Sequence, residues 1–277
     1  MSKGRYYALT AIFLWATLAG SAVYLKHIPP LFQLGVAFII GGLPALWSVH
    51  REWKKLNLHE LILHTWALLL YHGLLFYALR EPQPVISNVV NYLWPLLIII
   101  LGPLLIKESA YRWHTLFAIV LGCLGLSFLF WPTLKNGELS IGYGPLLALL
   151  GALTWSLYSV LLNRFKFAST PTALLLACLI CGVLFIGLSV FTETLPFLTL
   201  KDSVALLWLG VGPFGLAFYF WNQALRNASA SQIGSLSLLT PLLSSGILIA
   251  TTGTAVTWNL IIAITCILFA AYFGNKN

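Results

Sequence analysis

The amino-acid sequence predicts an all-α membrane protein of ten transmembrane helices, arranged as two inverted five-helix repeats. Of its 277 residues, 60% are hydrophobic and only 8% are charged. A soluble globular domain carries about 25% charged residues, so this chain has too little charge to cover a soluble surface. Apolar stretches long enough to cross a bilayer follow one another along the chain, and two short motifs recur at one constant offset.

The first half of the chain contains five apolar stretches of the length that a membrane span needs, about 20 residues. Each should be helical, because backbone amides find no partner in lipid. Lys3 and Arg5 precede the first stretch as in a signal peptide, but the apolar run from Tyr6 to Leu25 is too long for one and predicts a retained span. The expected spans of this half are residues 6–25, 31–49, 61–79, 86–106 and 115–131.

The second half contains five more such stretches. The long uncharged segment from Asn227 to Asn275 cannot be one helix, and Thr251-Thr252-Gly253-Thr254 supplies the turn that divides it. No Asp, Glu, Lys or Arg lies inside any of the ten expected spans. The expected spans of this half are residues 143–163, 173–192, 203–224, 231–250 and 258–273.

The basic residues predict the orientation, because Lys and Arg are enriched in cytoplasmic segments. With the N-terminus inside, 11 of the 15 lie in cytoplasmic segments and 4 in outer segments. We therefore expect a multi-pass protein of the cell inner membrane with both termini cytoplasmic. This bias accounts for the net charge of +8, so membrane lipid is an expected partner and nucleic acid is not. The outer set is Lys26, Arg80, Lys135 and Lys201.

The two halves, residues 1–135 and 136–277, show weak internal similarity. Ala78-Leu79-Arg80 ends the third span and Ala224-Leu225-Arg226 ends the eighth. Pro95 and Pro241 lie in the middle of the fourth and ninth spans, so both motifs recur at an offset of 146 residues. Because each half has five spans, the second must be inverted in the membrane. Inverted repeats are typical of transporters whose substrate site lies near the bilayer midplane.

The fourth span carries polar residues that are candidates for substrate binding. Asn88, Asn91 and Pro95 lie on one helical face, with Tyr92 and Trp94 beside it. Proline cannot donate the helical hydrogen bond, so Pro95 leaves the Asn91 carbonyl for a ligand or a neighbouring helix. The alternative is a proline kink whose asparagines only pack against another helix.

Tryptophan and tyrosine usually lie at membrane interfaces, but several here fall near the middle of expected spans. Trp15, Trp94 and Trp155 are the clearest cases, and a buried indole N–H needs a partner. An aromatic box around a planar or cationic substrate is one interpretation, and ordinary filling of a helix bundle is the other. Tyr158 lies on the same helical face as Trp155, and the eighth span carries Trp221 and Asn222.

Titratable groups give few other candidates. His64 and His72 lie on one face of the third span, with Tyr71 beside His72, which is nearer the middle and is the better candidate for a proton carrier. All seven acids lie in loops or at span ends, and no hydrolase, metalloprotease or phosphate-binding motif is present. Cys178 and Cys181 lack a second pair of ligands. We expect no enzyme activity, no metal and no cofactor.

At these residues the sequence resembles the drug/metabolite transporter superfamily, whose ten-helix members consist of two inverted five-helix repeats. The resemblance covers nearly the whole chain and includes Glu108, which matches an acid that often ends the fourth span, although Thr254 replaces it in the second repeat. More narrowly, the chain is similar to the aromatic amino acid exporter (YddG-type) subfamily. The similar runs are Asn91-Tyr92-Leu93-Trp94-Pro95, Leu14-Trp15, Gly151-Ala152-Leu153-Thr154-Trp155, Trp221-Asn222 and Thr240-Pro241-Leu242-Leu243-Ser244-Ser245.

The resemblance implies export of aromatic and related amino acids from the cytoplasm through a central cavity. Without an acid at the midplane, we expect alternating access that is uncoupled from ions, or only weakly coupled. A broad-specificity drug or metabolite exporter of the same superfamily is one alternative, and a membrane-embedded enzyme is another. The candidate substrate-binding residues are Trp15, Tyr71, His72, Asn88, Asn91, Tyr92, Trp94, Trp155, Tyr158, Trp221 and Asn222.

Overall fold

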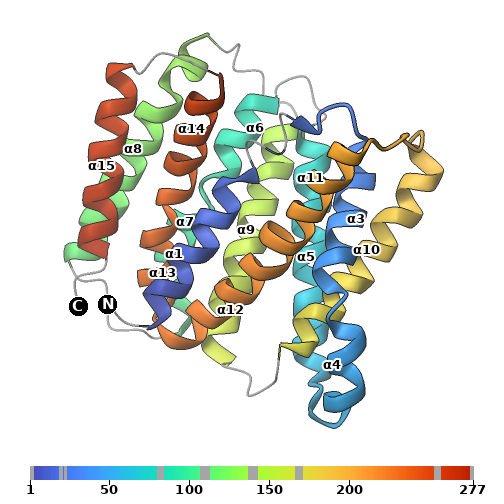
Figure 1. The fold of residues 1–277 in the computed structure, drawn as a ribbon. Helices are drawn as coiled ribbons and strands as arrows, with labels where there is room; N and C mark the ends of the chain where they lie inside the picture. Colours follow the sequence, from blue (N-terminus) through green and yellow to red (C-terminus); the bar gives the residue numbers. More distant parts are fainter. Residues whose placement is uncertain are drawn as a thin grey trace.

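The computed structural model describes residues 3–18, 21, 24–79, 84–106, 113–136, 143–165, 171–252 and 257–274. All regular structure within these ranges is helical (Figure 1). The first part of the chain forms α1 (Lys3–Ala16), α3 (Pro30–Gly42), α4 (Ala45–Glu52), η1 (Trp53–Lys55), α5 (Leu58–Ala78), α6 (Pro84–Asn91), α7 (Trp94–Ile106) and α8 (Trp113–Asn136). The second part forms α9 (Tyr143–Phe165), α10 (Thr172–Thr192), α11 (Leu200–Val211), η2 (Gly212–Leu216), α12 (Ala217–Asn227), α13 (Ala230–Ser237), α14 (Leu239–Thr252) and α15 (Trp258–Gly274).

The expected spans fall on these helices, although several are shorter or divided. By length and composition, Tyr143–Phe165, Thr172–Thr192 and Leu200–Asn227 could each cross a membrane. A fourth candidate is α3 with α4 and η1, which is bent by 43° between Gly42 and Ala45. Trp94–Ile106, Trp113–Leu129 and Trp258–Gly274 are apolar but shorter. The count of ten transmembrane helices stays a prediction.

Proline explains where two of the helices divide. The helix over the fourth expected span is interrupted at Tyr92 and Leu93, just before Pro95, and separates α6 from α7. The helix over the ninth is interrupted at Leu238, just before Pro241, and separates α13 from α14. Because proline has no N–H, it cannot bond to the carbonyl four residues earlier. Each of these prolines therefore follows a local interruption of its helix.

Side chains satisfy the first backbone N–H groups of several helices, which fixes where they begin. Pro30 opens α3, and the Glu193 carboxylate at the end of α10 accepts the N–H groups of Leu31 and Phe32, both at 3.0 Å. Asn57 accepts the N–H of Glu60 at the start of α5. Thr199 and Asp202 form a capping box on α11.

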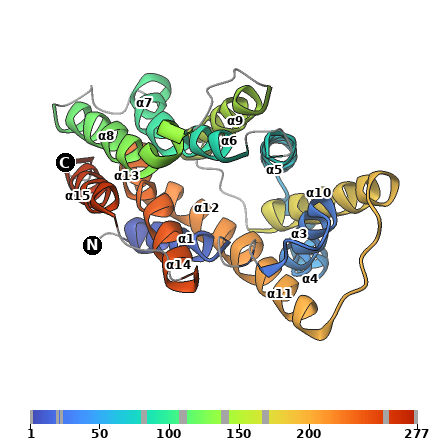
Figure 2. The ribbon, with the colours of Figure 1, turned by 90° about the horizontal axis from the view of Figure 1, so that it is seen from above.

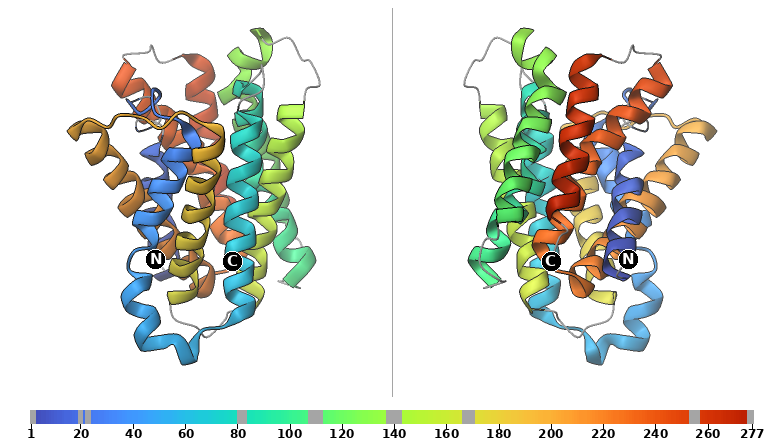
Figure 3. Two further views of the ribbon diagram at one scale, coloured as in Figure 1. Left: turned by 90° about the vertical axis from the view of Figure 1, so that its right-hand side faces the viewer. Right: turned by 90° about the vertical axis from the view of Figure 1, so that its left-hand side faces the viewer.

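The helices pack in two facing rows. Seen from above, α5, α9, α6, α7 and α8 lie along one row, and α11, α12, α1 and α14 lie along the other (Figure 2). The side views show that α1 starts and α15 ends at the end of the bundle where α4 lies (Figure 3). Contacts of α5, α6 and α7 with α9, and of α1 with α12, hold each row together. One large core of buried side chains lies between the rows, and a smaller one lies among α7, α8, α13 and α15.

Glycines allow α3 and α10 to approach closely. A Cβ atom on Gly182 would lie 2.7 Å from the backbone nitrogen of Ile39 and 3.0 Å from the carbonyl oxygen of Gly35. A Cβ atom on Gly42 would lie 2.6 Å from the backbone nitrogen of Leu179. Small residues at such crossings are how helices pack in lipid, where apolar burial does not drive association.

Replacing Gly182 by Ala should therefore separate α3 from α10. Overpacking of this kind destabilises a protein by about 1–3 kcal/mol. The measurement is the unfolding temperature of the purified protein in detergent. Gly187→Ala on the same helix is the matched control, because nothing lies within 4 Å of a Cβ atom there. Equal unfolding temperatures for the two variants would contradict the close packing.

Candidate functional site

Four tryptophans from four different helices form one cluster between the two rows. Trp15 of α1, Trp94 of α7, Trp155 of α9 and Trp221 of α12 are all buried. Trp15 lies 5.2 Å from Trp221, 5.5 Å from Trp155 and 6.3 Å from Trp94, between ring centroids. The remaining three pairs lie 5.6–6.5 Å apart. Every pair is thus within the range of direct aromatic contact.

Two of the four indole N–H groups donate hydrogen bonds to other residues of the protein. Trp15 Nε1 donates to the carbonyl oxygen of Pro213 at 3.1 Å. Pro213 lies in the single π-helical turn η2, where the regular hydrogen bonding of α11 and α12 is interrupted. Trp221 Nε1 donates to Ser159 Oγ at 3.2 Å. For Trp94 and Trp155, the described part of the chain provides no partner for the indole N–H.

The predicted pair on α5 borders this cluster. The Tyr71 ring lies 5.2 Å from Trp155 and 4.8 Å from His72. His72 is surrounded by rings, with Phe38 at 4.9 Å, and its Nδ1 donates to the carbonyl oxygen of Leu68 at 2.8 Å. The structure therefore places Tyr71 against the tryptophan cluster and His72 among aromatic rings.

The structure places the candidate residues in and just after α6 in two different environments. Asn91 is buried, and its Nδ2 donates to the Tyr71 hydroxyl at 3.4 Å. Its Oδ1 is buried and has no hydrogen-bond partner among the described residues. Asn88 is half-buried one turn earlier. Tyr92 instead packs on the smaller core, against side chains such as Leu96 and Leu238, so it is not brought to the tryptophan cluster.

A buried polar network lies next to the cluster, toward the start of α5 and the end of α12. Tyr158, whose ring is 5.2 Å from Trp155, bonds to His64 Nδ1 at 2.8 Å. His64 Nε2 lies 3.5 Å from both Asn222 Nδ2 and Glu60 Oε1. Arg226 completes the network, because its Nε donates to Asn222 Oδ1 at 2.9 Å and its Nη2 donates to Glu60 Oε1 at 2.7 Å.

Glu60 and Arg226 are functional candidates that the sequence analysis did not identify. Glu60 lies at a span end as expected, but its side chain is turned inward and only 1% exposed. Glu60 stands three residues after the N-cap Asn57. In the sequence this spacing is explained by helix capping alone, so it indicates no binding role. In the sequence, Arg226 is distinguished by its place in the repeated Ala-Leu-Arg motif. The recurrence of an arginine at the same place in both halves, as Arg80 and Arg226, is the sequence feature that could have indicated a functional role.

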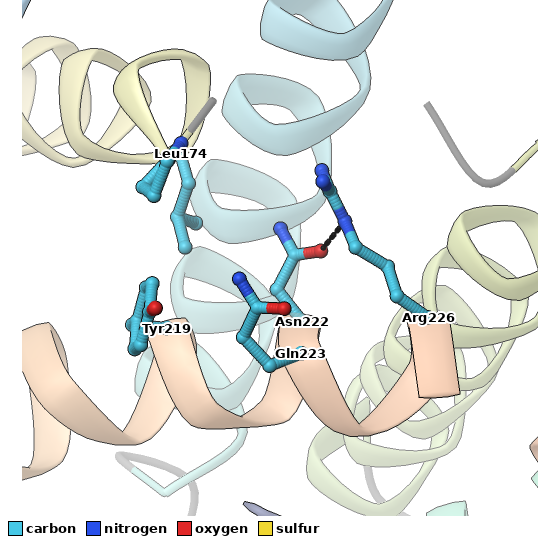
Figure 4. A pocket seen from close by; sticks show the side chains of 6 residues that line it. Leu174, Tyr219, Asn222, Gln223 and Arg226 are labelled. Carbon is cyan, nitrogen blue, oxygen red and sulfur yellow. Dashed lines mark hydrogen bonds between the residues drawn. The ribbon is translucent and has the colours of Figure 1, made fainter. Parts of the chain in front are cut away.

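Arg226 also lines a small pocket between α10 and α12. Tyr219, Asn222, Gln223 and Arg226 project from α12, and Leu174 faces them from α10 (Figure 4). Pro171 completes the lining, and the pocket is shallow and partly open to solvent, with a volume of about 10 Å³ that admits about one water molecule. Arg226 is the one residue of this lining with a formal charge, and its guanidinium also contacts the Glu60 carboxylate.

Three residues that carry the repeat or the family resemblance lie outside the described residues. Arg80, Glu108 and Thr254 fall outside the described ranges. Within these ranges, no group of three or more His, Cys, Asp or Glu side chains is gathered as metal ligands would be. Cys178 and Cys181 are buried thiols on α10, whose Sγ atoms lie 3.9 Å and 3.6 Å from the carbonyl oxygens of Phe214 and Thr65.

Comparison with known proteins places this arrangement in a family. The chain matches the family model of EamA-like transporters over residues 2–131 and over residues 142–275. The chain belongs to the EamA-like transporter family. Its resemblance to the drug/metabolite transporter superfamily is thereby confirmed, and it is a multi-pass membrane transporter.

Several relatives of this EamA-like transporter cover nearly all of it. It is 30% identical to an aromatic amino acid exporter, YddG, of Ancylobacter novellus over 262 residues, which are 90% of this chain and 88% of that protein. It is 24% identical to a probable amino-acid metabolite efflux pump of Salmonella typhimurium, over 99% of this chain and 96% of that protein. A solved crystal structure with 27% identity superposes with a TM-score of 0.89, over 99% of this chain and 96% of that chain.

Proposed function

We propose that this EamA-like transporter exports aromatic and related amino acids from the cytoplasm. The observation that carries the proposal is the cluster of Trp15, Trp94, Trp155 and Trp221, which joins four helices from both halves of the chain. Stacked and edge-on rings form the contacts that an aromatic side chain would use. The relative from Ancylobacter novellus is named for that activity.

The proposed mechanism is alternating access by rocking of two inverted halves, residues 1–135 and 136–277. Helices α6 and α13 support it, since both have eight residues and both their first and last residues are 146 positions apart. The two stretches that match the family model fall one in each half. The bias of basic residues supports a chain with both termini in the cytoplasm.

Polar groups beside the cluster can form hydrogen bonds to a bound amino acid. The buried Oδ1 of Asn91 lacks a partner among the described residues and can accept a hydrogen bond from a substrate. Asn88 lies one turn from Asn91, and on the opposite row the Asn222 amide is engaged with Arg226 and His64. The substrate brings its own balanced charges, and the Glu60 carboxylate is already paired with Arg226. We therefore propose facilitated diffusion without a coupled ion.

The test is phenylalanine counterflow in proteoliposomes, with and without an imposed proton or sodium gradient. Vesicles preloaded with phenylalanine should take up labelled phenylalanine, and neither gradient alone should drive accumulation. In vesicles without preloaded phenylalanine, accumulation driven by the proton or sodium gradient alone would contradict the uncoupled mechanism. If it vanished in His72→Ala, that histidine would be the coupling site instead. Absence of counterflow would overturn the substrate proposal.

A broad-specificity exporter of the same superfamily is the second candidate. The relative named a probable amino-acid metabolite efflux pump favours it. The same proteoliposomes distinguish the two functions through competition, because an amino acid exporter should respond to phenylalanine and tryptophan but not to planar organic cations. Inhibition by such cations at lower concentrations than phenylalanine would favour the broad-specificity function.

A further inference from the structure

The ends of α5 and α12 carry a buried ion pair that the aromatic cluster does not explain. Glu60 Oε1 accepts from Arg226 Nη2 at 2.7 Å, with side-chain exposures of 1% and 20%. Removing a carboxylate and a guanidinium from water costs several kcal/mol, and their attraction offsets this only with good geometry and further hydrogen bonds. The pair joins a helix of the first half to a helix of the second.

Each partner has capacity for a ligand of opposite charge. Arg226 is the charged residue of the pocket lining, where Asn222 and Gln223 provide amides and Tyr219 and Leu174 provide apolar surface (Figure 4). A guanidinium in this position is suited to a carboxylate. Glu60 Oε2 is buried and has no hydrogen-bond partner among the described residues. That oxygen is suited to an ammonium donor.

The pair is also continuous with the aromatic cluster. Glu60 contacts His64, His64 bonds to Tyr158, and the Tyr158 ring lies against Trp155. On the other row, Asn222 bonds to Arg226 and directly follows Trp221 in α12. The charged groups are thus linked to the aromatic cluster through Tyr158 and His64 on one row and through the neighbours Trp221 and Asn222 on the other.

We propose that Glu60 and Arg226 recognise the zwitterionic end of the substrate. The substrate carboxylate binds Arg226 and its ammonium group binds Glu60, so that the substrate takes the place of their direct contact. The exchange leaves the net charge of the buried site unchanged, because a zwitterion replaces one ion pair by two. The required substrate class is an α-amino acid with both charges, and a plain amine or carboxylic acid is rejected. The proposal rests on the proposed function as an amino acid transporter.

The test is equilibrium dialysis of purified protein in detergent against three labelled probes. Phenylalanine carries both charges, 3-phenylpropanoate only the negative one, and 2-phenylethylamine only the positive one. The unaltered protein should bind phenylalanine about tenfold or more tightly than either analogue, since each lacks one charged hydrogen-bonding group. Arg226→Gln should weaken the binding of phenylalanine and 3-phenylpropanoate by a similar factor and should not weaken the binding of 2-phenylethylamine. Glu60→Gln should do the reverse.

A double variant keeps the test decisive if either single variant fails to fold. Glu60→Gln with Arg226→Gln leaves no unpaired buried charge and should bind all three probes with similar affinity. If the double variant still prefers phenylalanine as the unaltered protein does, the proposal is wrong. Equal weakening of all probes in both single variants would also contradict it, because a merely structural pair predicts that result. Counterflow of phenylalanine by the unaltered protein distinguishes these failures from failure of the proposed function.

Discussion

Replacing Trp155 by Ala should reduce phenylalanine counterflow by about tenfold or more, because each aromatic contact contributes roughly 0.5–1.5 kcal/mol beyond its buried area. Trp155 joins the tryptophan cluster to Tyr71 and Tyr158. Its ring lies 5.2 Å from both Tyr71 and Tyr158 and 5.5 Å from Trp15. The measurement is the initial rate of exchange in proteoliposomes at matched protein content.

Two further variants separate substrate binding from loss of folding. Trp258→Ala is the matched control, because this tryptophan is 79% exposed on α15. Its counterflow should stay close to that of the unaltered protein. Trp155→Phe keeps an aromatic ring and should retain more activity than Trp155→Ala. Near-normal counterflow in folded Trp155→Ala would show that the cluster only fills the bundle.

The second large effect concerns stability. Replacing Arg226 by Met should lower the free energy of unfolding by about 3 kcal/mol, because removal of one partner leaves a buried charge uncompensated. The stranded group would be Glu60, whose side chain is 1% exposed. Glu60→Leu should destabilise less, since Arg226 is 20% exposed and can reach solvent. The measurement is denaturant-induced unfolding in detergent micelles.

Combining Arg226→Met with Glu60→Leu should recover most of the lost stability, because an apolar pair leaves no unpaired charge. Arg164→Met is the matched control. Arg164 is exposed near the end of α9, and its guanidinium donates to the carbonyl oxygen of Leu105 at 3.2 Å. If Arg226→Met and Arg164→Met unfolded at the same denaturant concentration, the ion pair would not contribute measurably to stability.

Most of the fold follows from patterns that are local in sequence. Helices lie within the expected spans because an apolar stretch in lipid has to satisfy its backbone internally. Pro95 and Pro241 mark the places where α6 and α13 end, because proline lacks the N–H that would continue the helix. The mid-span positions of Trp15, Trp94 and Trp155 indicated an unusual environment, and these residues do meet. Asn91 meets Tyr71, whereas Tyr92 lies on the smaller core.

The sequence by itself determined the class, the helices and the aromatic character of the site, because hydropathy and helix periodicity depend on near neighbours along the chain. Only the tertiary structure decided which polar groups meet. Glu60 and Arg226 are 166 residues apart and stand at the ends of expected spans, where charged side chains ordinarily face water. Their burial depends on how α5 and α12 pack across the bundle. Helix packing, unlike helix formation, is set by side chains distant in sequence, and so no local pattern revealed this pair.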